Sequence, residues 1–188
     1  MTVPSYLDRR FRDAAVQARL LDAGYDVVDS PVGPLLVAAT DHGLLRVSFE
    51  GGRDPDATLE QIARVAGPRV LRAPRAVAAA ERELDEYFAG NRRAFDLPVD
   101  LRGQPSFAAA VLDELAKVPY GHTRTYGELA ARAGNPKAAR AVGMVMNRNP
   151  LPIVLPCHRI VGASGSLVGY AGGLERKEQL LRLEGAIL

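Results

Sequence analysis

The sequence predicts an α+β fold, with a three-stranded antiparallel sheet and helices in its N-terminal part and mostly helices in its C-terminal part. Two observations support this prediction. Short apolar runs bounded by turn residues lie within residues 25–49, and apolar residues recur at helical spacing from Ser106 onward. A chain of 188 residues fits one or two domains at about 150 residues per domain. We place the boundary between an N-terminal domain at residues 1–102 and a C-terminal domain at residues 103–188.

The N-terminal part begins with residues 5–22, whose apolar side chains recur at helical spacing up to the stop signal Gly24. Three extended runs follow, and turn residues separate them. The runs cover residues 25–29, 35–40 and 44–49. Strands joined by such tight turns form an antiparallel meander. Two further helices are expected at residues 56–66 and 74–89.

In the C-terminal part, the sequence predicts helices that are separated by turns containing Gly and Pro. Ser106 is a candidate N-cap for the first of them, and the last covers residues 175–183. Between them, the turn Gly134-Asn135-Pro136 joins helices expected at residues 126–133 and 137–146. Two short helices joined in this way indicate a helix-turn-helix.

The composition argues against several classes of protein. With 47% hydrophobic and 24% charged residues, the chain is typical of a globular protein and not of a disordered one. Its apolar runs are shorter than the roughly 18 residues that a membrane span needs, and early charges argue against a signal peptide. The one cysteine, Cys157, can form neither an intramolecular disulfide nor a structural zinc cluster. We therefore expect a cytoplasmic protein.

Charge is distributed unevenly along the chain. Residues 1–118 contain 15 Lys and Arg against 18 Asp and Glu, whereas residues 119–188 contain 9 against 4. A basic C-terminal part joined to a mildly acidic N-terminal part favours a polyanionic partner such as nucleic acid.

The sequence LPCHRIV at residues 155–161 places the single cysteine beside His158 and Arg159. Adjacent positive charge lowers the pKa of a thiol from about 8.5 and favours a nucleophilic thiolate. An inert buried thiol is the alternative. The Gly-rich residues 162–173 favour a site, because glycine lets the backbone approach a ligand closely.

The way in which His158 could act on Cys157 depends on the shape of the backbone. Pro150, Pro152 and Pro156 are expected to hold the chain extended up to the cysteine. Adjacent side chains of an extended chain point to opposite faces, so a bridging water or a bend would be required. A base also needs a third group to orient it, and Glu184 is a candidate, although a solvated acidic residue is the ordinary interpretation.

The second helix of the helix-turn-helix presents small residues around Arg140, in the sequence KAARAVG at residues 137–143. A helix that reads the major groove normally offers long polar side chains to base edges, and here Asn147 and Arg148 lie only at the far end. A small-residue surface suits a narrow groove. Close packing against another helix would use the same residues.

Together these motifs resemble the O6-alkylguanine-DNA alkyltransferases, the methylated-DNA–protein cysteine methyltransferases. The resemblance rests on PCHR at residues 156–159, YAGG at 170–173, NPKAARAVG at 135–143 and the pair Asn149-Pro150. It extends from about residue 106 to residue 185. It is weaker in the N-terminal half, where DSPVGPL at residues 29–35 is similar to the family's first hairpin. The resemblance implies a ribonuclease H-like N-terminal domain and a winged-helix-like helix-turn-helix.

The resemblance also implies catalytic roles. Cys157 would attack the alkyl carbon on guanine O6 and keep the group as a thioether, so that each molecule acts once. His158 would activate Cys157 through a water, and Glu184 would orient His158. Tyr126 would donate a proton toward guanine N3, and Asn149 would brace the turn that leads to the cysteine.

For DNA, the resemblance implies minor-groove binding and base flipping, with Arg140 filling the stack after the nucleotide leaves it. The other residues at the groove would be Lys137, Ala139, Ala141, Gly143 and Arg148. The residues at the substrate pocket would be Met146, Ile160, Tyr170 and Ala171. The carbonyls of Cys157 and Ile160 and the amide of Ala171 would read the guanine edge.

The expected partner is double-stranded DNA containing O6-alkylguanine, with no cofactor, no metal and no membrane. A monomer is expected, and cooperative binding on DNA stays open. Four features depart from the family: Met144 stands where many relatives have a small residue, Ala171 stands where some carry serine, the cysteines of some relatives' zinc site are absent, and residues 5–22 form a longer N-terminal helix than is usual. The alternatives are a lesion-binding protein without transfer, a Cys-His hydrolase and a helix-turn-helix regulator.

Overall fold

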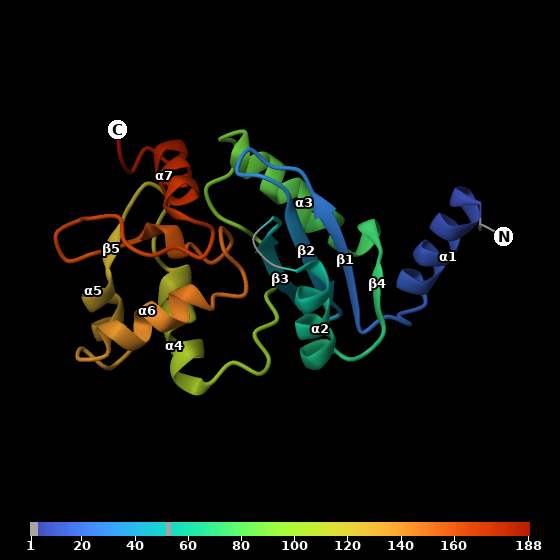
Figure 1. Ribbon diagram of the computed structural model, residues 1–188, viewed down its shortest axis with the longest axis horizontal. Helices are drawn as coiled ribbons and strands as arrows, with labels where there is room; N and C mark the ends of the chain where they lie inside the picture. Colours follow the sequence, from blue (N-terminus) through green and yellow to red (C-terminus); the bar gives the residue numbers. More distant parts are fainter. Residues whose placement is uncertain (1–3, 52–53) are drawn as a thin grey trace. The chain divides into compact units, whose positions relative to one another are not determined.

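The computed structural model describes residues 4–51 and 54–188, which fold into two compact units (Figure 1). The first unit runs to Asp85 and also contains Asp96–Arg102, and the second contains Glu86–Phe95 and Gly103–Leu188. The segment Glu86–Phe95 thus groups with the C-terminal residues. The division of roles between residues 1–102 and 103–188 stays a prediction. Within the described ranges, no helix combines the length and the apolar character that crossing a bilayer requires.

The first unit is built on a four-stranded sheet with the order β3-β2-β1-β4. Its strands are β1 (Ala23–Val28), β2 (Leu35–Thr40), β3 (Gly43–Phe49) and β4 (Val70–Arg72). Strands β1 to β3 form the predicted antiparallel meander, whereas β4 pairs with β1 in parallel. The prediction of three strands is therefore corrected to four. With three residues, β4 is too short to show the alternation that identifies a strand in a sequence.

Three helices belong to this part of the chain: α1 (Ser5–Gln17), α2 (Pro55–Ala66) and α3 (Pro74–Phe88), whose last residues enter the second unit. Helix α1 ends five residues before the predicted end at residue 22, because Arg19 adopts a left-handed conformation with φ 52°. The start of helix α2 is stabilised by two residues. The side chain of Asp54 accepts a hydrogen bond from the amide of Asp56, and Pro55 occupies the first turn.

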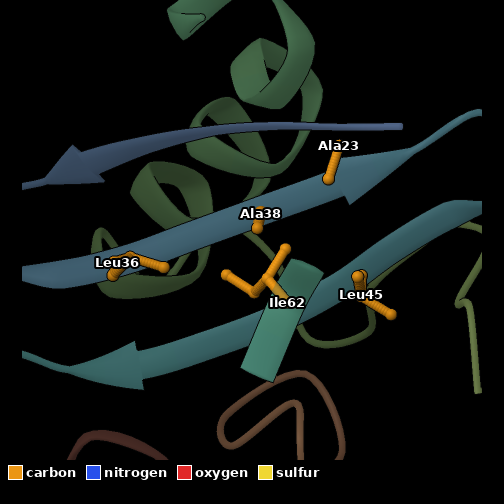
Figure 2. Packing of buried hydrophobic residues seen from close by; sticks show 5 residues of the cluster. All are labelled: Ala23, Leu36, Ala38, Leu45 and Ile62. Carbon is orange, nitrogen blue, oxygen red and sulfur yellow. The ribbon is translucent and has the colours of Figure 1, made fainter. Parts of the chain in front are cut away.

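The core of the first unit lies on both faces of β2, whose residues Leu35, Leu36, Val37 and Ala38 are all buried. On one face, Ile62 of α2 packs with Ala23, Leu36, Ala38 and Leu45, and α3 lies behind the strands (Figure 2). Gly24 permits this approach of α3, because a side chain there would overlap the Cβ of Ala76. A sheet covered on both faces explains why β2 is a continuous apolar run.

The second unit is mostly helical. It contains α4 (Ser106–Ala116), β5 (Arg124–Thr125), α5 (Tyr126–Arg132), α6 (Ala139–Asn147), the 3-10 helix η1 (Cys157–Arg159), β6 (Ile160–Val161) and α7 (Leu174–Leu183). Strands β5 and β6 pair in parallel. Helices α5 and α6 are the predicted helix-turn-helix. A capping box of Thr125 and Glu128 fixes the start of α5.

Three local predictions about this unit are wrong. Ser106 is the first helical residue of α4 and not its cap, because Pro105 occupies the N-cap position and offers no side-chain acceptor. Helix α6 begins at Ala139, two residues after the predicted start, so Lys137 lies before it. The chain before Cys157 is not extended: the amide of Leu155 bonds to the carbonyl of Leu151 at 2.7 Å, and the cysteine opens a turn of 3-10 helix.

Candidate active site

Cys157 is the first residue of η1 and is only 3% exposed. The predicted brace, Asn149, bonds to both ends of the preceding turn. Its Nδ2 donates to the carbonyl of Leu155 at 2.8 Å, and its Oδ1 accepts from the amide of Leu151 at 3.0 Å. The position of the thiol is therefore set by a side chain on the loop after α6.

Burial raises the pKa of the Cys157 thiol to about 11. A hydrogen bond with Asn149, the positive charge of Lys177 and nearby backbone amides oppose this rise only in part. The expectation that flanking positive charge lowers the pKa is wrong, because desolvation of the thiolate outweighs it and Arg159 is engaged elsewhere. The thiol is therefore protonated at neutral pH, and a base must remove its proton during any reaction.

His158 is completely buried, and its Nε2 lies 2.8 Å from Oε1 of Glu184. Burial would raise the pKa of Glu184, but hydrogen bonds from His158 and Arg159 outweigh it and lower the pKa to about 2. Burial also lowers the pKa of His158. An ionised Glu184 can only accept, so the neutral imidazole carries its hydrogen on Nε2 and keeps a lone pair on Nδ1.

Within the described part of the chain, the buried Nδ1 of His158 has no hydrogen-bond partner. This nitrogen therefore does not bond directly to the Cys157 thiol. The backbone bends at Cys157, but this bend alone does not bring the two groups into contact. A polar atom that is buried in this way is normally satisfied by water. The geometry suits a proton path from the thiol to His158 across one water molecule.

Arg159 was missed as a site residue. Its Nε donates to Oε2 of Glu184 and its Nη2 donates to Oε1, both at 2.9 Å. Its Nη1 donates to the carbonyl of Val118 at 2.5 Å. Arg159 therefore forms a bidentate salt bridge with the Glu184 carboxylate and does not act on Cys157. In the sequence, its position two residues after Cys157 suggested the opposite role.

Lys177 on α7 was also missed. It is completely buried, and its Nζ donates to the carbonyl oxygens of Ile160 at 2.6 Å and Val168 at 2.9 Å. Burial lowers the pKa of Lys177 to about 8, and the charge of Cys157 opposes the shift. In the sequence it stands in the charged run ERKE, which is typical of a solvated helix face, so no sequence signal identified it.

Two tyrosines lie close enough to Cys157 for a charge on its sulfur to change their pKa values. The hydroxyl of Tyr126, the first residue of α5, donates to the carbonyl of Val168 at 3.2 Å. Burial raises the pKa of both Tyr126 and Tyr170, and a negative charge on Cys157 raises it further. Both phenols therefore stay protonated at neutral pH. Of the other predicted pocket residues, Met146 and Ile160 are buried and Ala171 is exposed.

The outer face of α6 is a surface of small residues bordered by cations. Val142 and Met146 face inward and are buried, whereas Ala139, Ala141 and Gly143 are half-buried. The three predicted cationic DNA contacts, Lys137, Arg140 and Arg148, are all exposed. Met144 is also on the surface, with an exposed fraction of 59%. Gly143 lies against Tyr126, because a Cβ at this position would be 3.9 Å from its ring.

The predicted residues thus fall into two groups in one unit: a buried Cys-His-Glu relay and an exposed helix-turn-helix. This pairing is typical of proteins with a nucleophilic cysteine built into a nucleic-acid-binding domain. In residues 4–51 and 54–188, no group of three His, Cys, Asp or Glu side chains is placed to hold a metal ion. The predicted independence from a cofactor stays a prediction.

Comparison with known proteins gives the family. Residues 24–101 match the ribonuclease-like domain of 6-O-methylguanine DNA methyltransferase, and residues 106–186 match its DNA-binding domain. A methylated-DNA–protein-cysteine methyltransferase of Methanosarcina acetivorans is 44% identical over 166 residues, which cover 86% of this chain and 98% of that protein. One of Mycolicibacterium paratuberculosis is 45% identical over 164 residues, covering 85% and 91%. The chain belongs to the methylated-DNA–protein-cysteine methyltransferase family.

Solved structures agree with this assignment. The chain is similar to the Mycobacterium tuberculosis O6-methylguanine methyltransferase, with a TM-score of 0.74, 41% identity and coverage of 87% of this chain and 93% of that one. It is equally similar to the M. tuberculosis protein in complex with DNA, with a TM-score of 0.75, 40% identity and coverage of 86% and 92%. Helix α1 precedes the first residue that the family's domains match.

Proposed function

We propose that this protein repairs DNA by transferring the alkyl group from O6 of guanine to its own Cys157, irreversibly and once per molecule. The observation that carries the proposal is the buried Cys157 with the His158–Glu184 pair, in the same unit as a helix-turn-helix of this family. The name methylated-DNA–protein-cysteine methyltransferase, which the relatives bear, describes the same reaction.

The reaction balances as a single displacement. The proton of the Cys157 thiol passes through a water to Nδ1 of His158, and Glu184 stabilises the imidazolium that forms. Sulfur attacks the alkyl carbon, a C–S bond forms, and the C–O6 bond breaks with its electron pair going to guanine. Tyr126 donates its phenolic proton toward guanine N3, so that the base leaves as neutral guanine. The proton taken up by His158 then restores the Tyr126 phenol through solvent, so that the net reaction converts a thiol and an O6-alkylguanine into a thioether and guanine. The thioether has no leaving group, which makes the product final.

The target base must leave the duplex before it can reach a buried sulfur, and this costs a few kcal/mol. Arg140 is exposed on α6 and would fill the space in the stack. The small residues Ala139, Ala141 and Gly143 would let the helix enter the narrow minor groove. Lys137 and Arg148, which no carboxylate pairs with among the described residues, would bind backbone phosphates.

The substrate pocket would be formed by Met146, Ile160, Tyr170 and Ala171, with carbonyl groups of Cys157 and Ile160 at the guanine edge. The Ile160 carbonyl already accepts from Lys177 and has a second lone pair to offer. We also propose that the protein acts as a monomer in the cytoplasm, where a reducing environment keeps the thiol free.

The DNA product tests this proposal. A duplex with one O6-methylguanine is incubated with wild-type protein and with Cys157→Ser, and the oligonucleotide is digested and its bases quantified. We expect wild-type protein to convert the lesion to guanine in an amount equal to the protein added, and Cys157→Ser to bind the duplex and convert none. Conversion beyond one equivalent would disprove a single-use acceptor. Lesion binding by wild-type protein without conversion would indicate a damage-recognition protein.

A further inference from the structure

The Glu184 carboxylate has a partner that the relay described above does not use. Tyr87, near the end of α3, is 0% exposed, and its hydroxyl donates to Oε1 of Glu184 at 2.7 Å. The same oxygen is the atom that faces Nε2 of His158 at 2.8 Å. A single oxygen atom therefore connects the phenol of Tyr87 to the imidazole beside the nucleophile.

The ring of Tyr87 is fixed by other aromatic side chains of the second unit. Its centroid lies 5.3 Å from that of Phe88, 5.4 Å from Phe95 and 6.1 Å from Tyr120. Aromatic contacts at such distances hold a ring in one orientation. The direction of the Tyr87 hydroxyl is therefore set by packing before any substrate binds.

The remaining donors show what Tyr87 adds. Arg159 bonds to both oxygens of Glu184, and the amide of Gly121 reaches Oε2 at 3.3 Å. His158, Arg159 and Tyr87 are the titratable groups that bond to the carboxylate. Of these three groups, the tyrosine is the one that comes from the segment Glu86–Phe95.

We propose that Tyr87 is a positioning residue for the alkyl transfer, whose hydroxyl holds the Glu184 carboxylate oriented so that His158 presents a free Nδ1 to the water beside Cys157. The inference rests on the proposed function. Tyr87 belongs to the stretch that matches the ribonuclease-like domain and lies outside the stretch that matches the DNA-binding domain. The N-terminal half of the chain thus contributes a side chain to the relay.

Tyr87→Phe tests the role, because it keeps the ring and removes only the hydroxyl. Tyr120→Phe is the matched control: it removes a hydroxyl from the same aromatic cluster, but that hydroxyl donates to the carbonyl of Leu183 at 3.0 Å and not to Glu184. Single-turnover rates of methyl transfer from an O6-methylguanine duplex are measured for both variants and wild-type protein between about pH 5 and pH 9. Duplex affinity and thermal unfolding are measured in parallel.

We expect Tyr87→Phe to transfer its methyl group completely but about tenfold more slowly, as one lost hydrogen bond to a charged group predicts. A carboxylate that loses one donor stabilises the imidazolium of His158 more strongly, so the acid limb of the rate profile, which reports protonation of His158, moves to higher pH. Duplex affinity and the profile of Tyr120→Phe stay at wild-type values. In the Glu184→Gln background, Tyr87→Phe changes the rate no further, because its target carboxylate is gone.

Equal rates and equal pH profiles for Tyr87→Phe and Tyr120→Phe would overturn the inference and leave Tyr87 a packing residue. If Tyr87→Phe does not fold, 3-fluorotyrosine at position 87 supplies a stronger donor of nearly the same shape. The acid limb should then move to lower pH, and an unmoved limb would overturn the inference. A wild-type protein that transfers nothing would instead refute the proposed function, so the two failures are distinguishable.

Discussion

At the scale of single residues, the reactivity of this site depends on a buried thiol with a raised pKa. The Cys157 pKa of about 11 means that the thiolate is scarce at neutral pH and must form as the reaction proceeds. The neutral His158, held by an ionised Glu184, is the base that can do this. Lys177 is the one full positive charge among the groups that lower the thiol pKa.

Lys177→Met should therefore raise the pKa of Cys157 and slow alkylation of the thiol by iodoacetamide at pH 7. We expect about a tenfold loss, corresponding to a pKa shift of about one unit. Because the pKa of Lys177 is about 8, the difference from wild type is present below that pH and shrinks above it, where the lysine loses its proton. Lys117→Met, at an exposed lysine paired with Glu114, is the control and should react as wild type does. Equal rates for both variants at pH 7 would contradict this role.

Glu184→Gln should destabilise the fold, because it leaves the buried guanidinium of Arg159 without its counter-charge. Breaking such a buried pair costs about 3–5 kcal/mol of unfolding free energy. Folding lowers the Glu184 pKa from 4.5 to about 2, so this stabilisation is present above about pH 4.5 and is lost as the pH falls toward 2. Urea unfolding of wild type and variant at several pH values measures the difference in their unfolding free energies. A difference that grew on acidification would contradict the assigned ionisation of Glu184.

At the scale of elements, the start of α5 places a candidate catalytic residue, and α6 has one buried face and one exposed face. The capping box of Thr125 and Glu128 fixes the start of α5 and so places Tyr126 beside the carbonyl of Val168. Helix α6 buries Val142 and Met146 and leaves Arg140 exposed among small residues. Ala139, Ala141 and Gly143 are only half-buried on this face, which leaves room for the close approach to a groove that we propose.

Arg140→Ala should therefore weaken repair of duplex DNA by about tenfold or more, because the variant lacks the side chain that we propose fills the stack after flipping. The reaction with a free O6-alkylguanine base, which needs no flipping, should keep its wild-type rate. Arg132→Ala, on α5 and paired with Glu114, is the matched loss of charge and should affect neither substrate. Equal losses on duplex and free base would contradict a role in flipping.

At the scale of the whole molecule, the sequence predicted what depends on local chemistry. The meander and the helix-turn-helix were found from turn residues and periodicity, Cys157 and His158 from a motif, and the role of Glu184 from the family resemblance. The sequence-based prediction failed for features that depend on contacts between distant segments. Strand β4 forms only through its pairing with β1. Tyr87 is near Glu184 only because Glu86–Phe95 groups with the C-terminal residues. Lys177 was hidden for the same reason, since its burial depends on packing around α7 and not on its own run of charges.

The mass of the intact protein tests the central claim most directly. Wild-type protein is incubated with excess O6-methylguanine duplex, and its mass and its peptides are followed over time beside those of Cys157→Ser. We predict a gain of one CH₂ for each protein molecule, located on Cys157, that reaches a plateau and never exceeds it, with no gain in the variant. A methyl group on any other residue, or repaired DNA with unmodified protein, would contradict the account.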